Sequence, residues 1–181
     1  MSKIKLRDKY FIPYINAEQI DDAVTKITDR LNSYYKNSNS PIFVSVLSGA
    51  YMFTVDVLKK ITFDSDLAFI KISSYDGIKQ SGNIKVLLGI NQSIVGRDVI
   101  ILDEIVDSGN TIEFLKNEYK KMGAASVAVA TLIYKPHSLK EGVTVDFWGI
   151  EMTDDAFLVG YGLDYNEKGR TMKEIYILDK Q

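Results

Sequence analysis

The most constraining feature of this sequence is residues 99–112, which pass from an apolar strand through two acids into a turn and a helix. Residues 99–102 are branched apolar side chains, a pattern typical of a strand buried on both faces of a parallel sheet. Asp103 and Glu104 follow at the carboxyl end of this strand, where open α/β sheets bind their ligands. The stretch therefore predicts an α/β fold with a ligand site at this strand end.

The turn after the two acids has the composition of a phosphate-binding site. Residues 107–111 read Asp-Ser-Gly-Asn-Thr. The next apolar residues recur at helical spacing: Ile112, Leu115, Tyr119 and Met122. Backbone N–H groups at the start of this helix, its dipole, and the hydroxyls of Ser108 and Thr111 would attract a phosphate. The carboxylates of Asp103 and Glu104 beside this phosphate site suggest that the ligand is a phosphorylated sugar bound together with a metal ion. The alternative is an N-capped helix beside two solvated acids.

Composition excludes several other classes of protein. With 181 residues and 46% hydrophobic content, the chain is expected to form one globular domain. A net charge of −2 argues against a nucleic-acid-binding surface, and the absence of cysteine excludes disulfides and thiolate zinc sites. Its apolar runs are too short for a membrane span, and the charged start has no apolar segment behind it. We expect a cytoplasmic protein with no membrane or nucleic-acid partner.

The rest of the chain predicts alternating strands and helices. Asn16 and Gln19 have the spacing of a capping box, so a helix is expected over about residues 17–36. Buried strands are expected at residues 42–47, 67–72 and 126–134, with a returning arm at 83–89. A second helix should carry Met52, Val55, Leu58 and Ile61. The last forty residues predict short strands and turns forming a lid. Residues 10–15, broken by a proline, should cover the domain edge.

Three further features have two readings when taken alone. The turn at Ser48 and Gly49 offers backbone donors to a ligand, yet spacing alone favours a tight turn that uses the freedom of glycine. Residues 73–82 are polar and too long for a hairpin turn, so they form either a solvated linker or a functional loop. Lys135 is either a solvated strand end or a residue of the ligand crevice. For His137, the only histidine, a surface position is expected.

Taken together, these motifs resemble the type I phosphoribosyltransferases. Residues 99–111 match their phosphoribosyl-pyrophosphate (PRPP) motif: a hydrophobic strand, two acids, two apolar residues, then Asp-Ser/Thr-Gly-x-Thr. Residues 46–53 resemble the pyrophosphate loop, and residues 73–82 the flexible active-site loop. Residues 156–170 carry the Val-Gly-Tyr-x-Leu-Asp-Tyr-x-Glu string of the hypoxanthine-guanine branch. The four motifs occur in family order, and the resemblance covers about residues 11–178.

The resemblance implies a fold and an activity. The fold is a central, mostly parallel sheet flanked by helices with a small hood, in one domain (1–181) whose core spans about 17–135 and whose hood spans about 1–16 and 145–181. The activity is transfer of the 5-phosphoribosyl group from PRPP to hypoxanthine, and also guanine, giving IMP or GMP and pyrophosphate in purine salvage, with Mg²⁺. A homodimer or homotetramer is expected. A xanthine- or guanine-preferring relative and a PRPP-sensing regulator are the alternatives. The acidic balance counts against a regulator that binds nucleic acid.

The resemblance also assigns roles to individual residues. Asp107 would be the general base at purine N7, although a carboxylate on this turn could equally be only a helix cap. Asp103 and Glu104 would engage the ribose hydroxyls, directly or through Mg²⁺, with Asp164 as a second metal ligand. The other expected contacts are Leu47, Ser48 and Gly49 with pyrophosphate, Ser74 and Tyr75 in the closing loop, Ser108, Gly109, Asn110 and Thr111 with the 5′-phosphate, Lys135 with the 6-oxo group, Phe157 stacked on the base, Leu158 at its edge, and Arg170 near pyrophosphate.

Two features of the sequence depart from the family pattern. Most relatives have Glu-Asp where this chain has Asp103-Glu104, which keeps both charges but changes their reach. Many relatives carry a basic residue where this chain has Ser48. The backbone donors of the pyrophosphate loop are unaffected by that second change.

Overall fold

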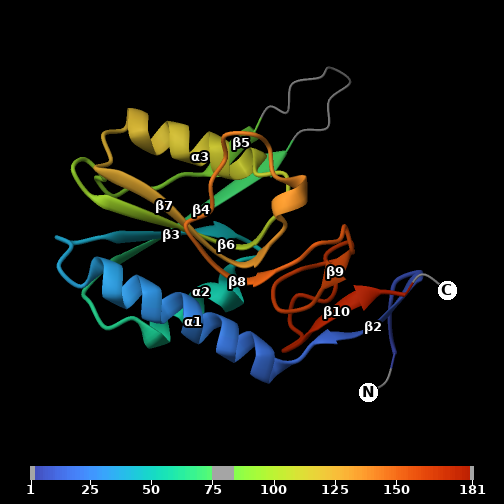
Figure 1. The fold of residues 1–181 in the computed structure, drawn as a ribbon. Helices are drawn as coiled ribbons and strands as arrows, with labels where there is room; N and C mark the ends of the chain where they lie inside the picture. Colours follow the sequence, from blue (N-terminus) through green and yellow to red (C-terminus); the bar gives the residue numbers. More distant parts are fainter. Residues whose placement is uncertain (1–2, 75–83, 180–181) are drawn as a thin grey trace.

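The computed structural model describes residues 3–74 and 84–179, which form two sheets of unequal size (Figure 1). The larger sheet has the strand order β5-β4-β3-β6-β7-β8. Its strands are β3 (Ile42–Leu47), β4 (Asp66–Ser74), β5 (Ile84–Leu88), β6 (Asp98–Val106), β7 (Ser126–Tyr134) and β8 (Phe147–Glu151). All neighbours are parallel except β5, which returns antiparallel to β4. The predicted α/β architecture is confirmed.

Helices cover both faces of this sheet. Helices α1 (Ala17–Tyr35) and α2 (Tyr51–Lys60) lie on one face, and α3 (Asn110–Lys121) lies on the other (Figure 1). The capping box at the start of α1 is confirmed, because Asn16 Oδ1 accepts from the Gln19 backbone N–H at 2.9 Å and Gln19 Oε1 accepts from the Asn16 N–H at 3.0 Å. None of the helices in the described part of the chain is long and apolar enough to cross a membrane.

Two details of helix packing differ from the sequence prediction. Of the four residues predicted to pack, Met52, Leu58 and Ile61 are partly buried against the main core cluster, whereas Val55 is 49% exposed. The fully buried residues of α2 are Phe53, Thr54 and Val57. Apolar residues occur all around this short helix, so their spacing did not define one buried face. On the face that is buried, the hydroxyls of Thr54 and Ser45 form a hydrogen bond 2.7 Å long. Met122 is 44% exposed because it caps α3 at its end instead of packing beneath it.

The smaller sheet forms a hood from both ends of the chain. Its order is β1-β2-β10-β9, with strands β1 (Ile4–Leu6), β2 (Lys9–Ile15), β10 (Ile175–Leu178) and β9 (Leu158–Val159). Pro13 lies within β2, but β1 pairs only with the strand's first three residues, so on that side the missing N–H of Pro13 breaks no ladder. We expected the C-terminal part of the hood to begin at residue 145. It begins later than that, because β8 belongs to the larger sheet.

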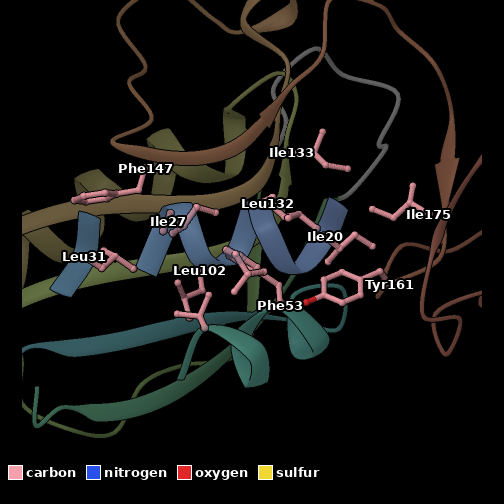
Figure 2. Close-up of a cluster of buried hydrophobic side chains, with 14 of the residues drawn as sticks. Ile20, Ile27, Leu31, Phe53, Leu102, Leu132, Ile133, Phe147, Tyr161 and Ile175 are labelled. Atoms are coloured by element: carbon pink, nitrogen blue, oxygen red, sulfur yellow. The ribbon is translucent and has the colours of Figure 1, made fainter. Parts of the chain in front are cut away.

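One hydrophobic cluster joins the hood to the larger sheet. Figure 2 shows Ile20, Ile27 and Leu31 of α1 and Phe53 of α2 among the buried side chains of this cluster. Tyr161 and Ile175, from the hood region, belong to the same cluster and are 3% and 0% exposed. Since interiors are close-packed, this shared core fixes the hood against the sheet. Residues of the hood can therefore contribute to a site at the strand ends.

Candidate active site

The predicted acidic pair lies in a cleft at the carboxyl end of the larger sheet. Strand β6 continues to Val106, so Asp103 and Glu104 lie among its last four residues, at the carboxyl end as predicted. The cleft has a volume of about 280 Å³. It is lined by residues from β3, β4, β5, β6, α3 and the hood, namely Val46, Leu47, Ser48, Gly49, Ile72, Ile84, Asp103, Glu104, Thr111, Asp164 and Arg170. Ser48 is exposed there, and the peptide bond before it is cis.

The two acids are held in an environment that resists negative charge. Asp103 is 9% exposed, and its Oδ1 accepts a hydrogen bond from the Glu104 backbone N–H at 3.1 Å. Burial raises the pKa of Asp103 well above its usual value, and the charge of Glu104 raises it further. Burial also raises the pKa of Glu104, while the Arg170 guanidinium acts in the opposite direction. A cation or several hydroxyl groups brought by a ligand would relieve this cost.

Arg170 and Asp164 reach the cleft from the hood. Arg170 Nη2 lies 2.7 Å from Asp164 Oδ1, and its Nη1 donates to the Gly162 carbonyl at 2.7 Å. Asp164 Oδ2 accepts from the Glu167 backbone N–H at 2.7 Å. The predicted second metal ligand is thus already engaged at both oxygens. In residues 3–74 and 84–179, no group of three Asp, Glu or His side chains is arranged to hold a metal ion by itself.

Close contacts bring the predicted pyrophosphate loop, the acids and the hood together. A Cβ at Gly49 would lie 1.6 Å from Glu104 Oε1, and a Cβ at Gly162 would lie 1.9 Å from the Gly49 carbonyl oxygen. At Gly162 the contact is with backbone and φ is 96°, so only glycine fits there, whereas at Gly49 the Glu104 carboxylate would have to move. Gly162 was not among the predicted site residues, although it stands at the variable position of the Val-Gly-Tyr-x-Leu-Asp string. Tyr51 was also missed; its hydroxyl donates to the Arg170 carbonyl at 3.0 Å.

The predicted phosphate turn forms a second cavity, of about 140 Å³, next to the first. Residues 105–112 and Asp103 line it. The N-cap of α3 is Gly109, with φ of 77°, and no side chain caps the helix. The reading of Asp107 as a helix cap is therefore wrong, because the chain enters the helix through a left-handed glycine two residues later.

This entry leaves backbone donors available at the turn. The Glu113 N–H bonds to the Gly109 carbonyl at 2.9 Å, which makes it the donor of the first turn of the helix. The N–H groups of Asn110, Thr111 and Ile112 precede it and have no partner within the helix. They open on the cavity with the hydroxyls of Ser108 and Thr111. Such a cavity can hold a phosphate group.

Lys135 lies between this turn and the segment before β9. Its side chain is 4% exposed, so the solvated reading is wrong. Lys135 Nζ donates to the Ala156 carbonyl at 3.1 Å and lies 3.6 Å from Asp107 Oδ2. Asp107 itself is half-exposed. The lysine therefore joins three predicted site elements, the turn, its own strand end and the aromatic segment.

The aromatic segment presents Phe157 at the surface of the site. Phe157 is 44% exposed and packs against Phe11 of β2 and Tyr165, with ring centroids 6.3 Å and 5.9 Å away. Leu158 follows it in β9 and is buried. Of the predicted closing loop, Ser74 ends β4, whereas Tyr75 and most of residues 73–82 lie outside the described residues.

Comparison with known proteins gives consistent matches. A family model described as the phosphoribosyl transferase domain matches residues 16–166. The chain is 36% identical over 165 residues to a hypoxanthine-guanine phosphoribosyltransferase from Bacillus subtilis, covering 91% of each chain. A Streptococcus thermophilus protein of the same name is 34% identical, covering 89% of this chain and 91% of the other.

Solved structures extend the similarity to three dimensions. A hypoxanthine-guanine phosphoribosyltransferase from Bacillus anthracis has a TM-score of 0.84 at 30% identity, covering 97% of this chain and all of the other (100%). A hypoxanthine phosphoribosyltransferase from Trypanosoma cruzi, solved as a mutant in a ternary substrates complex, has a TM-score of 0.86 at 29% identity, covering 93% of this chain and 95% of the other.

Proposed function

The chain belongs to the phosphoribosyl transferase domain family, and we propose that its reaction, PRPP-dependent phosphoribosyl transfer to a purine, uses hypoxanthine and guanine as acceptors. The resemblance seen in the sequence is confirmed, as is the fold it implied. IMP or GMP and pyrophosphate would be the products. The observation that carries the choice of acceptor is the buried ammonium of Lys135, which lies between the phosphate turn and the segment that carries Phe157.

The phosphate turn would hold the 5′-phosphate of PRPP. Its cavity offers uncapped N–H groups at Asn110, Thr111 and Ile112, together with two hydroxyls. Asp103 lines both this cavity and the neighbouring cleft, so a ribose bound between them would lie beside the acidic pair. The pyrophosphate would then face the loop at Leu47, Ser48 and Gly49, with Arg170 on the hood side.

The acidic pair would favour the transition state over the ground state. As the bond between C1 and pyrophosphate loosens, positive charge develops on the ribose ring. Asp103 and Glu104 are fixed by burial next to that ring, so their interaction with it strengthens as the charge grows. This differential stabilisation raises the rate of the chemical step.

The donor set fits Mg²⁺, which prefers carboxylate and phosphate oxygens. When bound, Mg²⁺ would screen the negative charge of the leaving pyrophosphate. Asp103 and Glu104 would hold it together with oxygens of PRPP, since these residues alone form no complete set. Asp164 could join only through its remaining lone pairs, because Arg170 and the Glu167 N–H bind its two oxygens.

Lys135 would read the 6-oxo group of the base. An ammonium has three N–H donors, and the described residues give it two partners, Ala156 and Asp107. The third donor would bond a 6-oxopurine but would have no acceptor on the 6-amino group of adenine. Phe157 would stack on the base, the Leu158 backbone would meet its edge, and Asp107 would take the proton from N7.

Initial rates test this proposal directly. Each of hypoxanthine, guanine, xanthine, adenine and uracil is supplied with PRPP and Mg²⁺, and nucleotide formation is followed. We expect turnover of hypoxanthine and guanine, and loss of activity in excess chelator. Xanthine as the best substrate would overturn the assignment of acceptor. PRPP binding without turnover of any base would favour a sensor. Cytoplasmic location and a homodimeric or homotetrameric state stay predictions; light scattering after size exclusion measures the second.

A further inference from the structure

A cluster of polar side chains lies just outside the proposed base site. The short 3₁₀ helix at Pro136–Ser138 follows Lys135 directly. His137 Nε2 lies 2.7 Å from Asp155 Oδ1, and Ser138 Oγ donates to the same oxygen at 2.9 Å. These hydrogen bonds, that of His137 first, lower the pKa of the Asp155 carboxyl. Two donors from one segment therefore converge on one acceptor of another, 17 and 18 residues along the chain.

The segment that carries Asp155 also carries the base-binding groups. Ala156, the next residue, accepts from Lys135 Nζ at 3.1 Å, and its own N–H bonds to Asp154 Oδ1 at 3.1 Å. Phe157 follows and presents its half-exposed ring. Two consecutive residues of this segment are therefore bound by consecutive parts of another: Lys135 bonds Ala156, and the 3₁₀ helix that follows Lys135 bonds Asp155.

The position of this cluster does not suit a role in global stability. The side chain of Asp155 is 80% exposed, and exposed pairs of this kind contribute little to folding. The hydrogen bonds to Asp155 and Ala156 instead restrain the segment between β8 and β9, which has no regular structure and leads directly into Phe157.

We propose that His137 and Ser138, acting through Asp155, are positioning residues that set the affinity for the purine base. They hold the Ala156 carbonyl on Lys135 and the Phe157 ring beside it, so the base meets a site that is already ordered. Ordering this segment on binding would otherwise reduce affinity. The inference rests on the proposed function, because it assigns Lys135 and Phe157 to the base.

Steady-state kinetics separate this role from a structural one. Asp155→Ala and His137→Ala should raise KM for hypoxanthine about three- to tenfold, the range expected for lost hydrogen bonds. KM for PRPP, kcat and the melting temperature should change little. His137→Gln should restore most of the affinity, because its amide N–H can replace the imidazole donor. Glu118→Ala is the matched control: it removes an exposed acid paired with Lys121 at 2.7 Å on α3, and KM should not move.

The same experiment distinguishes two kinds of failure. If the parent protein turns over hypoxanthine and the Asp155→Ala variant has the parental KM, the positioning role is refuted. Equal increases in the two KM values, or an equal effect of Glu118→Ala, would refute it as well, since these indicate a general structural effect. A parent without activity on any purine would refute the proposed function, and this inference with it. As His137 is the only histidine, its imidazole NMR signal should also shift when hypoxanthine binds.

Discussion

We expect the buried carboxylate of Asp103 to lower the stability of the fold while it contributes to PRPP binding. Asp103→Asn keeps the acceptor that binds the Glu104 N–H at 3.1 Å but removes the charge. The side chain is 9% exposed, and none of the ion pairs in the described residues includes it. We therefore expect the asparagine variant to be more stable than the parent at neutral pH and to bind PRPP poorly.

The magnitude follows from the general cost of burying an unpaired charge. Each unit by which folding raises a carboxyl pKa costs about 1.4 kcal/mol of stability once the group must be ionised. Relieving one buried charge is expected to gain on the order of 1–3 kcal/mol. For a domain of this size, 1 kcal/mol corresponds to about 2–4 °C in melting temperature. The variant should therefore melt several degrees above the parent without ligand.

The pH dependence gives the sign of the effect. Below the ordinary carboxyl pKa of about 4, Asp103 is protonated in both folded and unfolded chains, so parent and variant should be equally stable. As the pH rises through the raised folded-state pKa, the parent loses stability relative to the variant, and the difference is largest at neutral pH.

Denaturant unfolding across this pH range measures the difference, with Asp29→Asn on the exposed face of α1 as the control. Mg²⁺ and PRPP should raise the melting temperature of the parent but not that of the Asp103 variant. An asparagine variant that is less stable than the parent at neutral pH, or a stability difference that does not vary with pH, would refute the reasoning.

Three other substitutions test the site. Lys135→Ala should lower kcat/KM for hypoxanthine about 10- to 150-fold, since a charged hydrogen bond contributes about 1.5–3 kcal/mol; unchanged kinetics would return the lysine to a structural role. Asp107→Asn should bind PRPP normally and lose about 10²–10⁴-fold in turnover. A parental rate, with chemistry shown to be rate-limiting, would remove Asp107 as the base. Gly109→Ala should destabilise by about 2 kcal/mol or more and weaken PRPP binding, because φ is 77° and the new Cβ would lie 2.7 Å from Leu139 Cδ1. The control Gly142→Ala, with φ of 82° and no atom within 4 Å, should show the backbone cost alone; an equal loss at both glycines would exclude the packing contribution.

Local patterns in the sequence were sufficient for most of the helices and strands. The capping box at Asn16 and the mainly apolar strand β7 were found where predicted, because each depends on neighbouring residues or on burial of a whole strand. The acidic pair and the phosphate turn were also found, because the strand, acids and turn are consecutive in the chain. Contacts between residues close in sequence need no knowledge of the fold.

Other features depended on where distant segments meet. Lys135 is buried where the distant Ala156 carbonyl accepts its hydrogen bond, and Glu104 lies against a glycine of another loop. Asp107 was open to two readings until the left-handed Gly109 took the N-cap position of α3.

The sequence by itself determined the order of helices and strands, the strand that carries the acids, and the residues that form the phosphate turn. Only the tertiary structure decided which face of α2 is buried, that β8 joins the larger sheet, and that Arg170 and Asp164 pair at the mouth of the cleft. The physical reason is the range of the interactions. Caps and apolar periodicity act over a few residues, whereas burial of a charge or close approach of two backbones depends on the packing of segments far apart in the chain.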